Sequence, residues 1–344
     1  MLKLSQFKII SKNGCKLAAL WFCLSPFLIA SCQVQAQNNY LTLNQTAFAT
    51  VKYEAQANTI KELLRQNKFA QVEQILAEAL EKRLLTRGGS LYAAAVLDRV
   101  FAELDPQLLI FLDRWVQQNP QSSLAYTARS YFYYFYAWSF RGNKYTNKTS
   151  ERALQEYTRQ LTLCAKDIQQ ALSINQKNPL ALFSALRLGR NGGMPLEIFN
   201  QYFERLTAIV PFFNQAYQEK SLYLAPNWYG DSMTMLNFAK TSSISAPRGT
   251  AIPLLLPQAH DNLCNYERNC NKSEYYQQPL VWQDIEDSYL RLIEDFPRSG
   301  VYAYWFAKKA RRAGKTKIAR KYYEMALRRE PDNKLIRSKQ KQFR

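Results

Sequence analysis

The segment Ser122–Gly142, SSLAYTARSYFYYFYAWSFRG, constrains the fold of this chain more than any other stretch. Its apolar run over 131–138 is far shorter than the roughly 20 residues that a membrane-spanning helix needs. A helix that is apolar on every side is normally buried. Ser122 can cap its first turn, and Gly142 stands where helices usually end. We therefore predict a central core helix packed by its neighbours, with an aromatic ligand cleft as the alternative.

Apolar residues recur at spacings of three and four along most of the chain, which is the pattern of amphipathic helices. Residues 60–80 predict a helical hairpin with its turn at Asn67-Lys68, and Glu151–Ile174 predicts a long helix. Asn178-Pro179 and Asp231 are signals that start helices. Alternating β-branched runs are scarce. The predicted fold class is therefore all-α.

The C-terminal region shows the spacing of a tetratricopeptide repeat. A turn glycine is followed by small, aromatic and small residues at helical intervals, and then by a proline. Ala307 supplies the small residue of the first helix, where Ala303 and Phe306 replace the usual Trp and Leu. We expect tetratricopeptide-like hairpins stacked as a solenoid. The positions that carry this pattern are Gly314, Ala319, Tyr323, Ala326, Leu327 and Pro331.

The N-terminus has the pattern of an export signal. A basic region without acids precedes the apolar segment 17–30, which is too short to span a membrane and right for a secretory signal. Ile29-Ala30-Ser31-Cys32 resembles the bacterial lipobox, which implies cleavage before Cys32 and diacylation of its thiol. Ordinary cleavage after Ala36 is the alternative. In lipoproteins of this type, Gln33 favours the outer membrane, facing the periplasm.

Three cysteines remain beyond Cys32. Cys264 and Cys270 lie in one polar stretch, DNLCNYERNC, and predict a small disulfide in an oxidising compartment. Zinc bound with His260 is the alternative, but the spacing fits no standard zinc pattern and a fourth ligand is missing. Cys164 lies on a helical pattern and is expected to be a buried thiol. We expect no metal and no cofactor.

The formal net charge of +19 is concentrated at the C-terminus. Residues 308–344 carry fifteen Lys and Arg against three carboxylates. Three roles are open for this basic patch: a solvated cap of the helical stack, a contact with anionic lipid, or a contact with an acidic protein. Export makes nucleic acid an unexpected partner despite the charge. The cations that flank the last hairpin are Lys315, Lys317, Arg320, Lys321, Arg328 and Arg329.

The middle of the chain resembles a bacterial family catalogued as domain of unknown function 4034, over roughly residues 63–240. A second patch, Pro226-Asn227-Trp228-Tyr229-Gly230, resembles that family's Pro-x-Trp-x-Gly segment, although Tyr229 and Asp231 stand where the family is richer in glycine and serine. The resemblance implies a tetratricopeptide-like helical fold and no established activity. It makes Arg141 and Trp228 family-like residues with a structural or a binding role. The first patch consists of Trp115, Pro120, Ser122, Ala125, Ala128, Ala137-Trp138 and Arg141-Gly142.

Catalytic patterns are scarce in this sequence. A Ser-His-Asp or Cys-His arrangement would have to use His260, the single histidine. Acids gather over 284–295, and paired carboxylates can hydrolyse glycosides, but acids along a helix are usually its solvated face. No dinucleotide-binding, phosphate-loop or metalloprotease signature is present. We predict no catalytic residue.

These observations predict a non-enzymatic envelope lipoprotein that acts as a helical-repeat scaffold and binds a protein or peptide on its concave face. The alternatives are an immunity-type lipoprotein that inhibits a periplasmic toxin, and a cell-envelope enzyme that uses paired carboxylates. Trp138 is expected in the core, on the same helix face as Tyr134. The predicted organisation is a signal at 1–32, a tether at 33–50, a helical domain at 51–245, an irregular loop at 246–278, and a tetratricopeptide-like hairpin with a basic tail at 279–344.

Overall fold

The computed structural model describes residue 49 and residues 51–86, 88–142, 149–266, 270–339 and 342–343. All named elements in these ranges are helices, which confirms the all-α class. The predicted signal, Cys32 and the tether up to residue 48 lie outside the described residues. In chain order the elements are α1 (Tyr53–Arg65), α2 (Phe69–Glu81), α3 (Tyr92–Ala102), α4 (Leu108–Gln118), α5 (Ser123–Arg141), α6 (Glu151–Ile174), α7 (Pro179–Gly192), α8 (Leu196–Ile209), α9 (Asn214–Tyr223), α10 (Ser232–Ser245), the 3-10 turn η4 (Ile252–Leu254), α11 (Leu255–Tyr266), α12 (Lys272–Gln277), α13 (Pro279–Asp295), α14 (Val301–Arg312), α15 (Thr316–Arg329) and α16 (Lys334–Arg337).

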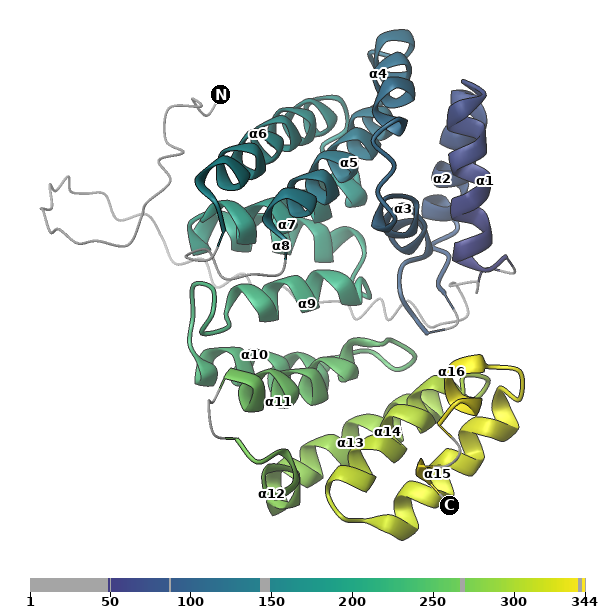
Figure 1. Ribbon diagram of the computed structural model, residues 1–344, viewed down its shortest axis with the longest axis vertical. Helices are drawn as coiled ribbons and strands as arrows, with labels where there is room; N and C mark the ends of the chain where they lie inside the picture. Colours follow the sequence, from purple (N-terminus) through teal and green to yellow (C-terminus); the bar gives the residue numbers. More distant parts are fainter. Residues whose placement is uncertain are drawn as a thin grey trace, which may run out of the picture.

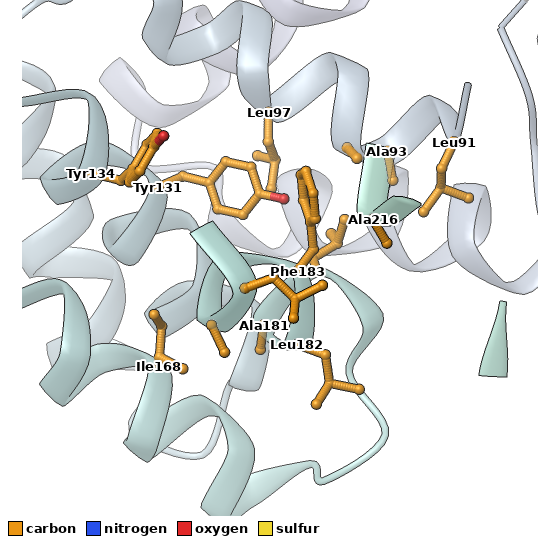
Figure 2. Close-up of a cluster of buried hydrophobic side chains, with 14 of the residues drawn as sticks. Leu91, Ala93, Leu97, Tyr131, Tyr134, Ile168, Ala181, Leu182, Phe183 and Ala216 are labelled. Atoms are coloured by element: carbon orange, nitrogen blue, oxygen red, sulfur yellow. The ribbon is translucent and has the colours of Figure 1, made fainter. Parts of the chain in front are cut away.

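Helix α5 is the predicted central helix. The Ser122 hydroxyl accepts a hydrogen bond from the Ala125 backbone N–H and caps its start, and Gly142 ends it at φ +60°. α5 packs against α2, α3, α4, α6 and α7, and its most extensive interface is with α6. Figure 2 shows Tyr131 and Tyr134 of this helix in one core with Phe183 of α7. The prediction of a buried core helix is therefore confirmed for most of its length.

The helices from α5 to α13 follow one another as layers along the long axis of the molecule, with α1–α3 beside the first layers (Figure 1). Local signals set several boundaries. The Asn178 carboxamide oxygen accepts from the Leu180 and Ala181 N–H groups at the start of α7, and the Asp231 carboxylate caps α10. This layered order is compatible with the predicted solenoid.

Two hydrophobic cores divide the chain. The first runs from Ala57 to Leu263 and is built on α1–α11, whereas the second runs from Ala251 to Phe343 and is built on η4 and α12–α16. The second core contains the predicted tetratricopeptide-like hairpin, α14 and α15. Its turn glycine, Gly314, has φ +71°, and Ala319 is buried against the preceding helix.

The segment 246–278 corrects one prediction. Instead of an irregular loop it contains η4, α11 and α12, and it is shared between the two cores. Pro257 does not prevent this helix, because it is the third residue of α11, where a backbone N–H has no acceptor within the helix. The buried Leu255, Ala259 and Leu263 show the helical spacing.

Candidate functional site

A cleft of about 1270 Å³ opens between the two ends of the described chain. On one side it is lined by residues 49–54 and by 86–102, at α1 and α3. On the other side it is lined by 299–305 and 329–334, at the start of α14 and between α15 and α16. These elements face each other on one flank of the molecule (Figure 1). We call this feature the terminal cleft; it is larger than most small-molecule pockets, which measure roughly 300–1,000 Å³.

The two sides of the terminal cleft are joined by direct contacts. The Tyr302 hydroxyl of α14 donates a hydrogen bond to the Gly88 carbonyl oxygen. Next to it, Gly89 has φ +74°, and a Cβ atom there would come within 2.5 Å of the Phe296 ring. Only glycine satisfies both conditions. The distance between the two sides is therefore fixed by packing between the two cores.

Aromatic side chains supply much of the wall. Tyr53, Tyr92, Phe135, Tyr302 and Trp305 all line the terminal cleft. Trp305 is 36% exposed, and the Lys308 ammonium lies 4.3 Å from its ring centroid. The Tyr92 hydroxyl is buried and has no hydrogen-bond partner among the residues that the structure describes. An exposed indole beside aliphatic surface is the type of group that anchors protein interfaces.

The charges that line the terminal cleft balance, with two cations and two carboxylates on each side. One side carries Lys52, Arg99, Glu54 and Asp98, and the other carries Arg329, Lys334, Glu330 and Asp332. Several of them already have partners. Arg99 pairs with Glu103, and Arg329 donates to the carbonyl oxygens of Ile293 and Ser299. Lys52, Asp332 and Lys334 are outside the ion pairs of the described residues, and their side chains remain available at the rim.

Behind the cleft lies a buried charge cluster that the sequence analysis missed. We define it as the α7 cluster: Arg187 and Arg190 of α7 with Asp98 of α3 and Glu219 of α9. Arg187 donates two hydrogen bonds to the Asp98 carboxylate, at 2.5 and 2.7 Å, and Arg190 donates to Glu219 at 2.7 Å. Burial lowers the pKa of Arg187, but the adjacent Asp98 carboxylate outweighs this effect and the pKa is raised. Two arginines three apart in the otherwise apolar helix 179–190 were the signal available in the sequence.

The family-like residues lie outside the lining of the terminal cleft. Trp138 packs against the first core, and its side chain is half-buried. The Arg141 guanidinium lies 4.9 Å from its ring centroid, and the Tyr157 ring centroid lies 5.9 Å away. Tyr134, on the same face, is buried as expected. Trp228 is half-buried, with Arg190 lying 4.4 Å from its ring centroid. These contacts describe cation–aromatic packing at the edge of the first core.

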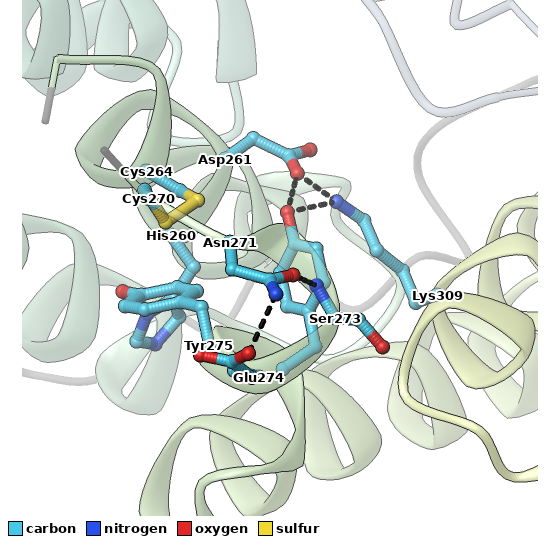
Figure 3. The surroundings of a disulfide bond; sticks show 10 residues. His260, Asp261, Cys264, Cys270, Asn271, Ser273, Glu274, Tyr275 and Lys309 are labelled. Atoms are coloured by element: carbon cyan, nitrogen blue, oxygen red, sulfur yellow. Dashed lines mark hydrogen bonds and ion pairs between the residues drawn. A yellow bond between two sulfur atoms is a disulfide. The ribbon is translucent and has the colours of Figure 1, made fainter. Parts of the chain in front are cut away.

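Cys264 and Cys270 form a disulfide that joins the last turn of α11 to the start of α12 (Figure 3). His260 is buried nearby, 2.8 Å from the Tyr275 hydroxyl through Nδ1 and 3.2 Å from Asp284 through Nε2. Burial lowers the pKa of His260 below its usual value of 6.5, although Asp284 opposes the shift. A disulfide leaves neither thiolate for zinc, and no cluster of three metal-ligating side chains occurs in the described ranges.

Four of the five acids over 284–295 that were considered for a carboxylate pair already have partners, and Asp287 is exposed. Asp284 contacts His260 and Lys240, and Glu286 accepts from the Trp282 indole N–H at 2.9 Å. The same helix continues to Glu294 and Asp295, which both pair with Arg248. Cys164 is fully buried, which raises its pKa to about 12 and leaves a thiol of low reactivity.

The basic patch divides into two groups. Arg329 is bound to backbone carbonyl oxygens, and the Lys315 ammonium lies 4.8 Å from the Trp282 ring centroid. The other four side chains are exposed, with no ion pair among the described residues: Lys317, Arg320, Lys321 and Arg328.

Residues 56–196 match the model of a family described as Domain of unknown function (DUF4034). The match includes Trp138 and Arg141, whereas Trp228 lies beyond it, so the resemblance over 63–240 is supported up to residue 196. No curated protein matches the chain. In the described part of the chain, no helix has both the length and the apolar character that crossing a membrane requires.

Proposed function

We propose that this chain, whose residues 56–196 match the DUF4034 model, is a non-catalytic binding scaffold that holds a segment of another protein in the terminal cleft. The observation that carries this proposal is the lining: an exposed Trp305 and rim charges without internal partners, in a cleft whose two sides are joined by packing. No histidine or cysteine lines the terminal cleft. Its Asp98 carboxylate is neutralised by Arg187.

A peptide suits this cleft better than a small molecule. The volume exceeds that of ordinary small-molecule sites, and both cations and carboxylates border it. A peptide segment can place an apolar side chain against Trp305 while its charged neighbours meet Lys334 and Asp332. Such a central aromatic anchor with a polar rim is how protein interfaces are usually built.

We further propose that the scaffold is a lipoprotein of the bacterial envelope, anchored through Cys32 and facing the periplasm from the outer membrane. The lipobox-like Ile29-Ala30-Ser31-Cys32 carries this proposal. The Cys264–Cys270 disulfide supports it, because structural disulfides persist in oxidising compartments. Radiolabelled palmitate should enter the wild-type protein and not a Cys32→Ala variant. A wild-type protein that never takes up the label would exclude acylation.

The binding proposal can be tested with a random peptide display library panned on mature protein, residues 32–344 with Cys32→Ser. We expect enriched peptides whose affinity, measured by fluorescence polarisation, falls at least about tenfold in Trp305→Ala. Ile244→Ala is the matched control, because Ile244 is 70% exposed and does not line the terminal cleft. Failure to enrich any peptide, or equal losses in both variants, would contradict the proposal.

A further inference from the structure

The outward face of α15 is a row of cations without carboxylate partners. We define the α15 face by its four exposed cations: Lys317, Arg320, Lys321 and Arg328. The opposite side of the same helix is buried through residues such as Tyr323. The helix is therefore fixed on the second core, and it lies at one end of the molecule (Figure 1). Its four cations are exposed to solvent there.

What distinguishes the α15 face is that its free cations share one side of one helix. Free exposed cations such as Lys68 and Lys177 lie on separate parts of the described chain, and other cations there are paired. Lys82 pairs with Glu78, Arg99 with Glu103 and Arg159 with Glu156, each within one turn of helix. On α15 the single acid, Glu324, is four residues from both Arg320 and Arg328, yet it joins no ion pair. Four like charges on a helix of 14 residues repel one another unless an external anion compensates them.

The basic character continues beyond α15. Arg311 at the end of α14 is exposed, and so are Lys334 and Arg337 of α16. Cations with an internal role are distinguishable, since Lys309 is buried and paired with Asp261. The free cations thus extend over neighbouring helices of one end of the fold.

We propose that the α15 face docks on an anionic phospholipid bilayer. None of the large apolar side chains that are well exposed in the described residues belongs to α15; the nearest in sequence is Leu335 of α16, which is 49% exposed. The α15 face itself therefore lacks the aromatic or aliphatic anchors on which protein interfaces depend. Several exposed cations without a central apolar side chain are complementary to a bilayer surface of phosphate headgroups. Each Lys or Arg near such a surface strengthens the attachment. The inference stands on these charges and does not depend on what binds in the terminal cleft.

The position of the N-terminus agrees with this placement. Ala49 lines the same cleft as Lys334, so the described chain begins beside the basic end of the fold. Sixteen residues separate Cys32 from Ala49, and a chain of that length spans at most about 60 Å. A bilayer that holds an acylated Cys32 therefore lies within that distance of the terminal cleft. A basic patch beside a lipid anchor provides the second signal that stable attachment requires.

The test uses mature protein, residues 32–344 with Cys32→Ser, sedimented with vesicles. One set contains phosphatidylcholine alone, and the other contains equal parts of phosphatidylcholine and phosphatidylglycerol. The test variant replaces Lys317, Arg320, Lys321 and Arg328 by Gln. A control with the same change in net charge replaces four other exposed cations that have no ion-pair partner, namely Lys68, Arg152, Lys166 and Lys177.

We expect wild type and control to bind only the anionic vesicles, and less strongly as salt shortens the Debye length to about 10 Å at 0.1 M. The test variant should bind several hundred-fold more weakly, since each cation contributes about fivefold. Equal losses in test variant and control would show a general charge effect and overturn the docking face. Absence of binding to anionic vesicles at low salt would also overturn it. In that case, binding of wild type to polyglutamate would indicate an acidic protein instead.

Discussion

The α7 cluster and the α15 face use the same residue types in opposite ways. In the α7 cluster, Arg187 and Arg190 are buried, and each meets a carboxylate from another helix. On the α15 face, Arg320 and Arg328 are exposed and meet none. A buried charge has to be compensated inside the protein, whereas an exposed charge is solvated by water and can bind an external partner. The difference separates cations that hold the fold from cations that are available for binding.

The same distinction applies to the terminal cleft. Asp98 belongs to the α7 cluster and also lines the cleft, so its charge is already compensated. Lys334 and Asp332 on the opposite side are outside the ion pairs of the described residues. Binding is therefore assigned to side chains that the fold leaves without partners among the described residues.

The largest expected effect is on the α7 cluster. Arg187→Met should lower the free energy of unfolding by about 3–5 kcal/mol. Asp98 loses its cation, and Glu219, which keeps Arg190, loses a second cation 3.8 Å away. Urea denaturation followed by circular dichroism measures this loss. Arg320→Met on the α15 face is the control, and it should stay within about 0.5 kcal/mol of wild type. Comparable effects of the two substitutions would erase the distinction between the regions.

Trp138 provides an intermediate case, because it is half-buried under Arg141. Trp138→Ala should lower the free energy of unfolding by about 2 kcal/mol. This is less than the loss of about 3–5 kcal/mol expected for a fully buried aromatic residue. Trp115 is the matched reference: it is fully buried and its ring stacks 5.8 Å from Phe69. Equal losses of stability in Trp138→Ala and Trp115→Ala, measured by urea denaturation, would mean that the Trp138 ring is as buried as that of Trp115.

His260 should produce the smallest effect, through pH. Its pKa is lowered by burial, so below about pH 6.5 the unfolded chain binds a proton that the folded chain does not. The contribution of His260 to the free energy of unfolding is therefore fully present above about pH 6.5. It decreases as the pH falls toward the folded-state pKa, by at most about 1.4 kcal/mol per pH unit. Thermal or urea unfolding between pH 7 and 5 should show this slope in wild type and a shallower one in His260→Gln. Identical slopes would show that His260 does not contribute.

Local sequence signals predicted the elements well. The Ser122 and Asn178 caps and the Gly314 turn depend on residues close in sequence, so composition and spacing reveal them. α11 was not predicted, although its proline, Pro257, lies in the first turn, where a proline costs a helix little. Half-burial of Trp138 depends on how far α6 covers the end of α5, which no local pattern records.

The candidate site could not be predicted from the sequence in the same way. The terminal cleft joins Tyr53 to Asp332, and the α7 cluster joins Asp98 to Arg187, so both depend on contacts between distant segments. The sequence located the basic patch but did not separate Arg329, which is bound to backbone carbonyls, from the free Arg328. Tertiary packing determines which of two neighbouring arginines is bound inside the protein and which remains available for an external partner.

The most direct measurement is site-specific photo-crosslinking in bacterial cells that produce the full-length protein. A photoreactive phenylalanine replaces Trp305 inside the terminal cleft, and in separate strains it replaces Ile244 or Leu280, which are more exposed but lie outside it. The account predicts a discrete crosslinked protein at position 305 and none at 244 or 280. Crosslinks of equal intensity at all three positions, or none at 305, would contradict the assignment of binding to the terminal cleft.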